Sequence, residues 1–368
     1  MSVLEKLKKN STIKDSSLLS VSKFFNKKDM ISTHIPALNI ALSGQLDGGF
    51  VPGLTLFAGP SKHFKSLFSL ILAKSYLEKY PESVLLFYDA EFGTPKAYFE
   101  SLGIDQSRVL HVPLKNFEEL KFDIVQQLEQ LERGDRVIIL VDSLGALASK
   151  KELDDALDNK SVADMTRAKA AKSLFRMITP YLNRLDIPMV GVSHVYDSLS
   201  LFPTKIVSGG QGAYLAADTI FIVGRSQQKD GTDVTGYDFI INVEKSRYVK
   251  EKTKIPIEVS FEGGLSKWSG LLDIALESGH VVKPKNGWYA RVNKETGAIE
   301  EKSWRRKATS CKEFWGPILT TKSFNEYIRS TYQISNGDII QDSELDTVLN
   351  DLIEDDLTED SIEDDNDE

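Results

Sequence analysis

The chain lacks the features that mark membrane proteins and secreted, disulfide-bonded proteins. Its 368 residues include one cysteine, Cys311, which excludes an internal disulfide and a metal site built from several cysteines. No apolar run approaches the roughly 18 residues that a membrane-spanning helix needs. The first residues, MSVLEKLKKNSTIKD, lack the apolar stretch of a secretion signal. We therefore expect a cytoplasmic protein that does not enter a membrane.

Basic residues are absent from the C-terminal end. Residues 351–368 contain eleven acids and no base. The whole chain has a net charge of −9, so the remaining residues carry +2. Nucleic-acid binding stays possible, because it needs local basic surface and not a basic total. The acidic end is expected to be disordered. Two interpretations of it stay open: a solvated end, or a segment that competes with DNA phosphates for basic surface.

The chain has no internal repeat, and from Leu54 onward short apolar runs alternate with helical patterns. Continuous apolar strands that alternate with helices predict a mostly parallel sheet covered on both faces. The last three runs follow one another on short turns, which predicts an antiparallel extension. The expected strands are LTLFAG, VLLFYDAE, RVIILVDS, PMVGVSH, DTIFIVGR, YDFIINVEKSR and KIPIEVSFEGG, and the main expected helices cover residues 66–80, 117–134 and about 162–183.

These patterns divide the chain into four parts. Residues 1–30 form a short N-terminal segment with one or two helices, which we expect to pack on an adjacent protomer. Residues 31–268 form the α/β core. Residues 269–335 form a small C-terminal α/β domain, with a helix at LLDIALESG, a hairpin near NGWYAR and a helix near SFNEYIRSTY. Residues 336–368 form the acidic tail.

Residues 59–66, GPSKHFKS, lie between an expected strand and an expected helix, as a phosphate-binding loop requires. In such a loop, backbone N–H groups surround the phosphates, a lysine reaches the terminal phosphates and a hydroxyl binds Mg²⁺. Gly59, Lys65 and Ser66 match these positions. Phe64 stands where the second glycine is expected, and the torsions that glycine tolerates are less accessible to it. The octapeptide alone therefore leaves an ordinary strand–helix turn open.

Two carboxylates strengthen the prediction of a nucleotide site. Asp142 ends the apolar run VIILVDS, and α/β sheets bind ligands, including Mg²⁺, at the carboxyl ends of their strands. Glu91 ends VLLFYDAE and is a candidate to polarise the attacking water. Either acid alone is also compatible with a simple strand-end cap. The loop and both acids, on three strand ends, together predict a site for ATP and Mg²⁺.

Several segments resemble the RecA family of recombinases and, within it, the strand-exchange proteins of T-even-type phages. They are GPSKHFKS, FYDAEFG, VDSLGALASKKE, DMTRAKAAKSLFR, VEKSR and KPKNGWYAR. The resemblance extends from SKFFN near the N-terminus to WGP near residue 316. The phage members resemble this chain in having phenylalanine at the position of Phe64. The resemblance implies a RecA-type core that binds ATP and Mg²⁺.

The resemblance also implies roles for further residues. Tyr98 matches an aromatic residue that stacks on adenine. His194 matches a position where many relatives have a glutamine that senses the γ-phosphate. Lys245 and Arg247 match basic residues that contact the ATP of the neighbouring protomer, where cations stabilise the transferred phosphate. The resulting assignments are Glu91, Lys65 and His194 as catalytic; Ser66 and Asp142 as Mg²⁺ ligands; and Gly59, Pro60, Ser61, Lys62, His63, Phe64, Lys65, Ser66, Leu67, Tyr98, Asp142, Lys245 and Arg247 as nucleotide-binding.

By the same resemblance, two segments are candidate DNA-binding loops. The first, about residues 150–164, is acidic, so direct contact by most of its residues is not expected. The second, about residues 196–213, combines aromatic and aliphatic residues with a lysine and glycines. Glycine would allow it to order around a strand, apolar residues would enter gaps between stretched bases, and amides and lysine would meet phosphates. The DNA-binding candidates are Lys205, Gly209, Gly210, Gln211 and Gly212. A flexible surface loop is the alternative.

These features predict an ATP-dependent recombinase that forms helical filaments on single-stranded DNA and promotes pairing and strand exchange with double-stranded DNA, in recombination, repair and replication. One alternative is a hexameric helicase of the same fold, for whose separate N-terminal domain the first thirty residues leave no room. The other is a non-catalytic paralogue, which the intact Lys65, Ser66, Glu91 and Asp142 disfavour. The expected partners are further copies of the chain, mediator proteins and single-strand-binding proteins, with no membrane.

Overall fold

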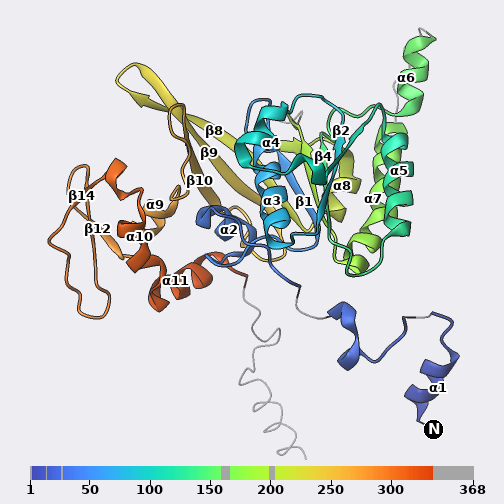
Figure 1. The fold of residues 1–368 in the computed structure, drawn as a ribbon, viewed down its shortest axis with the longest axis horizontal. Coiled ribbons are helices and arrows are strands. Elements are labelled where there is room, and N and C mark those ends of the chain that lie inside the picture. The colour runs from blue at the N-terminus through green and yellow to red at the C-terminus, as the bar shows by residue number, and fades with distance from the viewer. Residues whose placement is uncertain (1, 14, 26–27, 159–165, 199–203, 335–368) are drawn as a thin grey trace, which may run out of the picture. The chain divides into compact units, whose positions relative to one another are not determined.

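The computed structural model describes residues 2–334, apart from 14, 26–27, 159–165 and 199–203. Met1–Gln333 form one compact unit, built around a large twisted sheet (Figure 1). In the described part of the chain, that sheet contains nine strands in the order β11-β10-β9-β8-β1-β5-β4-β2-β3. The predicted acidic tail lies outside the described residues. No helix in the described ranges has the length and apolar character needed to cross a bilayer.

One part of the sheet is parallel, as predicted. It contains β1 (Gly53–Ala58), β5 (Pro188–Ser193), β4 (Val137–Asp142), β2 (Val84–Asp89) and, at the edge, β3 (Val109–Pro113). Every residue of β1, β4 and β5 is buried, which explains why these segments are continuously apolar and do not alternate.

The predicted antiparallel extension is also confirmed. β8 (Thr219–Asp230) runs parallel to β1, and β9 (Asp233–Ser246), β10 (Lys254–Ser260) and β11 (Gly264–Leu265) follow it as an antiparallel series. β8 and β9 form a long hairpin that projects beyond the sheet (Figure 1).

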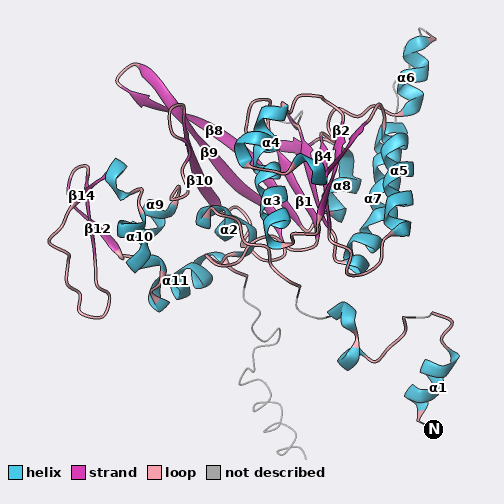
Figure 2. Ribbon diagram, in the orientation of Figure 1, coloured by secondary structure: helices cyan, strands magenta, loops and turns pink. Residues whose placement is uncertain are grey.

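Helices cover both faces of the sheet, so the core has two hydrophobic layers (Figure 2). α2 (Pro36–Ser43), α3 (Lys65–Lys79) and α4 (Lys96–Leu102) contribute apolar residues to one layer. α5 (Phe117–Gln130) and α7 (Thr166–Leu185) contribute to the other. Two covered faces are what a doubly wound α/β sheet requires.

The end parts of the described chain are smaller units of secondary structure. The N-terminal segment contains α1 (Val3–Asn10) and two short 3-10 turns, Leu19–Val21 and Lys23–Phe25. The C-terminal part contains α9 (Leu271–Glu277), β12 (Val281–Lys285), β13 (Trp288–Arg291), β14 (Trp304–Arg305), the 3-10 turn Arg306–Thr309, α10 (Lys312–Leu319) and α11 (Lys322–Tyr332).

The two segments predicted as DNA-binding loops are partly regular. Lys150–Leu157 form a helix, α6, which a capping box at Ser149 and Glu152 starts; the loop prediction overlooked this S-x-x-E signal. Residues 159–165 lie outside the described residues. The second segment holds a small hairpin, β6 (Val195–Asp197) with β7 (Lys205–Val207), followed by α8 (Gly210–Ala216).

Candidate nucleotide-binding site

The register of the parallel strands brings the predicted site residues to one edge of the sheet. β1 and β5 pair with Ala58 opposite Ser193, and β2 and β4 pair with Asp89 opposite Asp142. All four strands therefore end at the same edge. The predicted residues at or just beyond these ends are Gly59, Glu91, Asp142 and His194.

The loop 59–66 connects the end of β1 to the start of α3 in the geometry of a phosphate-binding loop. The N–H of Gly59 donates to the carbonyl of Ser193 at 3.2 Å. A Cβ at Gly59 would approach the carbonyl oxygen of Val223 to 2.9 Å, so a side chain does not fit there. Lys65 and Ser66 then start α3, which directs the N-terminus of that helix and its N–H groups at the loop.

Phe64 takes the left-handed conformation that the sequence motif reserves for glycine. Its φ is 61° and its ψ is 13°. For a residue with a side chain this backbone costs about 1–2 kcal/mol. Its ring stacks on Phe239 at 4.7 Å between centroids and meets Phe68 edge-on at 5.7 Å. We infer that these contacts offset the backbone cost, and that phenylalanine replaces glycine here without changing the path of the loop.

This balance predicts that glycine replaces Phe64 at a lower cost in stability than alanine does, which is the reverse of the usual order within a helix. Phe64→Ala should lose the ring contacts and keep the backbone cost, whereas Phe64→Gly loses the same contacts but relieves that cost. Phe64→Gly should therefore be the more stable of the two by about 1–2 kcal/mol. Phe68 is the matched control, because it is fully buried within α3. There glycine should be worse than alanine by about 1 kcal/mol. Urea unfolding of the four variants tests this, and the same order at both positions would contradict it.

Lys65 lies inside the loop and is only 6% exposed. Its Nζ donates to the carbonyl oxygen of Pro60 at 2.7 Å. Burial lowers the pKa of Lys65, although the carboxylates of Glu91 and Asp142 oppose that shift. The lysine thus lies between the loop backbone and the two predicted acids.

The other members of the loop have their own contacts. Nδ1 of His63 lies 2.8 Å from the carbonyl oxygen of Ser61, and burial lowers the pKa of His63. Lys62 has a φ of 60°, and its carbonyl accepts a hydrogen bond from Arg225 at 3.3 Å. Leu67 is half-buried in the first turn of α3. The hydrogen bonds of His63 and Lys62 help to fix the path of the loop between β1 and α3.

Asp142 is buried at the end of β4 and is only 4% exposed. Its Oδ2 accepts a hydrogen bond from Thr94 at 2.8 Å. Burial raises the pKa of Asp142, and the hydrogen bonds from Ser66 and Thr94 oppose that rise. Ser66 and Asp142, the two predicted Mg²⁺ ligands, are therefore brought together.

Glu91 forms the centre of a polar cluster. Nε2 of His194 lies 2.8 Å from its Oε1, and the hydroxyl of Ser143 hydrogen-bonds to the same oxygen. Burial alone would raise the pKa of Glu91, but the hydrogen bonds from Ser143 and His194 and the charge of Lys65 lower it overall. The carboxylate is therefore ionised at neutral pH, as a group that polarises water requires.

His194 also joins this cluster to the second candidate DNA-binding segment. Its carbonyl accepts a hydrogen bond from the N–H of Ser208 at 2.8 Å, and the hydroxyl of Ser193 donates to the carbonyl of Ser208 at 2.6 Å. β6 begins directly after His194. The base of the hairpin is therefore bonded to the residue that contacts Glu91.

Tyr98 and the DNA-binding candidates lie on elements that follow β2 and β5 in the chain. Tyr98 is in the first turn of α4 and is 42% exposed. Nζ of Lys205 on β7 is 2.7 Å from Asp197 on β6. Gly209 and Gly210 have φ values of 103° and 77° at the start of α8, and Gln211 is exposed. A Cβ at Gly212 would come within 2.6 Å of the Cα of Lys172, so this glycine allows α8 to pack closely on α7.

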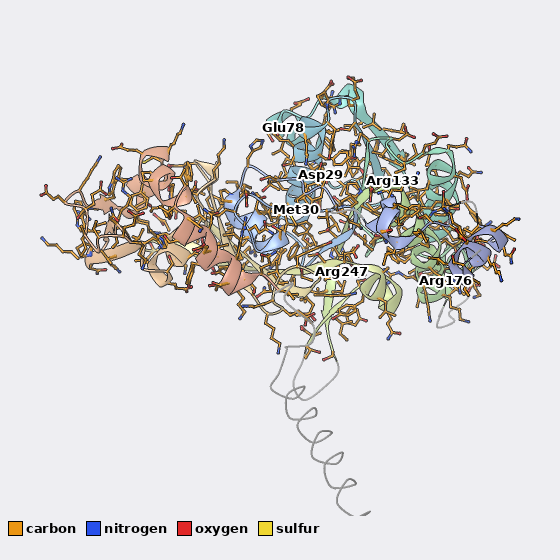
Figure 3. All side chains as sticks on the ribbon, turned by 90° about the horizontal axis from the view of Figure 1, so that it is seen from below. Asp29, Met30, Glu78, Arg133, Arg176 and Arg247 are labelled. Atoms are coloured by element: carbon orange, nitrogen blue, oxygen red, sulfur yellow. The ribbon has the colours of Figure 1, made fainter. Side chains whose placement is uncertain are left out.

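Lys245 and Arg247 lie at the opposite edge of the sheet from the loop. Lys245 pairs with Ile220 at the start of β8, and Thr219 pairs with Thr55 near the start of β1. The loop follows the far end of β1. Figure 3, which views the molecule from below, shows Arg247 on this underside. These two basic residues are therefore not brought to the nucleotide site of their own chain.

Both basic residues are held by neighbours at their own edge. Nζ of Lys245 donates to the last carbonyls of α8, those of Tyr214 at 2.9 Å and Leu215 at 3.2 Å. Arg247 pairs with the buried Asp218 at 2.5 Å. Burial lowers the pKa of Lys245, and the charge of Arg247 adds to that shift.

Three residues at these two edges were missed in the sequence. Ser143 directly follows Asp142, so its place after a strand-end carboxylate was the available signal. Asp218 is the first residue of the expected strand DTIFIVGR, and a carboxylate at the start of an apolar strand was the signal at the other edge. Thr94 reaches Asp142 from 48 positions away, and no local pattern announces such a contact.

The residues at the loop fit a nucleoside triphosphate with Mg²⁺. The loop offers backbone N–H groups and a buried lysine, and its two predicted Mg²⁺ ligands, Ser66 and Asp142, lie together beside it. Among the described residues, no cluster of three or more histidine, cysteine, aspartate or glutamate side chains could hold a metal alone. Mg²⁺ would instead use one or two protein ligands, here Ser66 and Asp142, together with phosphate oxygens, as it commonly does.

The fold and this edge of the sheet define an α/β protein in which a predicted phosphate-binding loop connects β1 to α3. A model of the RecA N-terminal domain matches residues 4–266. A model of the C-terminal domain of the bacteriophage T4 recombination and repair protein matches residues 268–328. Together they cover most of the chain. The chain belongs to the RecA family.

Individual relatives agree with this assignment. The chain is 50% identical to the recombination and repair protein of Enterobacteria phage T4 over 355 residues, which are 95% of this chain and 91% of the relative. It is 24% identical to the protein RecA of a Nocardioides species over 301 residues, 78% of this chain and 84% of the relative. It is 25% identical to the protein RecA of Desulfotalea psychrophila over 278 residues, 74% and 75% of the two chains.

Proposed function

We propose that this protein is a DNA recombinase that binds and hydrolyses ATP and assembles as a filament on single-stranded DNA. The observation that carries the proposal is the convergence of Lys65, Ser66, Glu91, Asp142 and His194 at one edge of the sheet. It occurs in a chain half identical, along nearly its whole length, to a recombination and repair protein. Strand exchange breaks no covalent bond, so ATP would serve to switch the filament between states of high and low DNA affinity.

The chemistry proposed for this edge follows from the contacts of each side chain. The loop and Lys65 would bind the phosphates, and Tyr98 would stack on the adenine. Ser66 and Asp142 would hold Mg²⁺, which neutralises charge on the phosphates when bound. Glu91 would orient and polarise the attacking water, and its low pKa keeps it charged for that role.

DNA binding would communicate with this edge through His194. The hydrogen bonds between His194, Ser193 and Ser208 fix the base of the hairpin. Tyr196 and Ile206 on that hairpin are 54% and 38% exposed and would meet bases. Backbone amides at the start of α8 would bind DNA phosphates, and they belong to Gly209, Gly210, Gln211 and Gly212. At the other end of the same helix, a carbonyl accepts a hydrogen bond from Lys245.

Lys205 provides a specific test of DNA contact. Lys205→Ala should weaken binding to all single-stranded sequences alike. It should also reduce the steepness of the plot of log affinity against log salt concentration by the amount expected for the loss of about one phosphate contact. The control variant is Lys254→Ala, because Lys254 is an exposed lysine at the start of β10. This variant should leave the slope unchanged. Fluorescence anisotropy with labelled oligonucleotides across a salt titration measures both. An unchanged slope for Lys205→Ala would remove it from the interface.

Filament assembly is proposed from two exposed features. Val3, Leu4 and Leu7 of α1 are 73%, 56% and 64% exposed, so this capped amphipathic helix has an apolar face available for an adjacent protomer. Lys245 and Arg247 lie at the edge opposite to the loop, where they would face the nucleotide site of the next copy. A head-to-tail contact of this kind repeats along a helical axis.

DNA-stimulated ATP hydrolysis and strand-exchange assays, with electron microscopy of the protein on single-stranded DNA, test the proposal. We expect turnover that depends on DNA, and helical filaments in the presence of an ATP analogue. Closed rings would favour a hexameric helicase, and DNA binding without turnover would favour a non-catalytic paralogue.

A further inference from the structure

Two side chains meet on a single oxygen of Glu91. Nε2 of His194 lies 2.8 Å from Oε1, and the hydroxyl of Ser143 bonds to the same atom. The other oxygen, Oε2, accepts no hydrogen bond from the described residues. The carboxylate is therefore held from one side and presents its second oxygen for another contact.

The two donors differ in how firmly they are fixed. Ser143 is fully buried, and its hydroxyl accepts a hydrogen bond from the N–H of Ala146 at 3.3 Å. The next residue, Leu144, donates its N–H to the carbonyl of Val192 on β5 at 2.8 Å. Ser143 is thus part of the rigid end of β4. His194 is more than a third exposed and continues directly into the hairpin β6–β7.

The chemistry of the two donors differs as well. An imidazole donates from Nε2 only in one tautomer or when protonated, whereas a serine hydroxyl always carries a proton to donate. A rearrangement of the hairpin would move His194 but not Ser143. Glu91 would then still be held at Oε1 by a donor that belongs to the sheet.

We propose that Ser143 is a positioning residue for ATP hydrolysis. Its hydroxyl fixes Oε1 of Glu91, so that Oε2 is directed at the attacking water whichever position His194 takes. This inference rests on the proposed ATPase function and adds to it a residue that acts through Glu91 and touches neither nucleotide nor DNA.

Ser143→Ala tests the role directly. We expect kcat for DNA-stimulated hydrolysis to fall about 10- to 100-fold, the size expected for losing a hydrogen bond to a charged group. KM for ATP and the affinity for single-stranded DNA should stay unchanged. Ser143→Cys keeps a weaker donor of similar size, and its kcat should fall between those of serine and alanine. The matched control is Ser75→Ala, because Ser75 is also buried and donates its hydroxyl within α3 at 2.9 Å to Ile71; it should keep the wild-type kcat.

A double-mutant cycle with Glu91→Gln separates positioning from a general structural effect. If Ser143 acts through the carboxylate of Glu91, its replacement should lower kcat several-fold less in the Glu91→Gln background than in the wild type. An equal fold-change in both backgrounds would overturn the proposal. So would a wild-type kcat for Ser143→Ala, or a loss limited to KM and thermal stability. Wild-type protein without turnover would instead contradict the proposed function, so the two failures are distinguishable.

Discussion

Glu91→Gln should slow DNA-stimulated ATP hydrolysis by about 10²- to 10⁴-fold, the usual contribution of a general base. The amide oxygen of glutamine can still accept the hydrogen bonds that Ser143 and His194 make to Oε1. The variant therefore keeps the shape of the cluster and loses its charge and its capacity to accept a proton. Binding of ATP and of single-stranded DNA should persist, and filaments should last longer because the step that releases DNA is slow.

Three measurements check this prediction: steady-state hydrolysis, nucleotide affinity and filament lifetime on single-stranded DNA. Glu313→Gln is a suitable control, because Glu313 is exposed on α10 and pairs with Lys302 at 2.8 Å, far along the chain from the loop. If the Glu91→Gln variant loses its affinity for nucleotide, then Glu91 binds the metal or stabilises the fold. If turnover is unaffected, another group polarises the water.

The core sheet and the grouping of the candidate residues at its edge could be predicted because they depend on local patterns. A strand covered on both faces must be apolar at every position, so VIILVD and its counterparts are visible in the sequence. Parallel strands must end at a common edge, so carboxylates that follow such runs are expected to meet. Lys65, Glu91 and Asp142 lie close together at this edge, as predicted.

The rest depended on contacts between distant segments. Phe64 departs from the loop motif. The ring contacts that offset the cost of its left-handed backbone include one with Phe239 on β9, 175 positions later in the chain. The glycines at the start of α8 suggested mobility, but Gly212 lies within the helix and allows it to pack closely against α7. The capping box at Ser149 and Glu152 is a local signal that the prediction overlooked, and it starts a helix where a loop was expected.

The position of Lys245 and Arg247 follows from register, which the sequence does not display. β9 runs antiparallel to β8, and β8 runs parallel to β1, so the last residues of β9, Lys245 and Ser246, lie level with Leu56 and Thr55 of β1, with β8 between the two strands. Gly59 lies three residues beyond Leu56, so at about 3.3 Å per residue the backbone of Lys245 lies roughly 10 Å back from the loop along the strands, with β8 also in between. The side chains of Lys245 and Arg247 bond to Tyr214, Leu215 and Asp218 and not to the loop of their own chain.

Two variants that are each nearly inactive should therefore restore turnover when they are mixed. Lys245→Ala with Arg247→Ala removes the cations proposed to contact the neighbouring nucleotide, and cations in that position contribute about 10³- to 10⁵-fold to phosphoryl transfer. Lys65→Ala removes the lysine of the loop. If each nucleotide site combines the loop of one protomer with the basic pair of the next, random mixing in equal amounts completes about a quarter of the head-to-tail interfaces. Action within a single chain would complete none, because each variant lacks one half.

The double variant should still bind ATP as a monomer, because its loop is intact. Arg247 also pairs with Asp218 and Lys245 with α8, so thermal unfolding of each parent must first exclude a loss of fold. Turnover is then measured across mixing ratios, with co-assembly on single-stranded DNA verified by a fluorescent label on each variant. We expect a maximum near equal amounts, and Lys254→Ala mixed with Lys65→Ala gives the dilution control. Co-assembled mixtures no more active than their parents would show that the basic pair does not act across the interface.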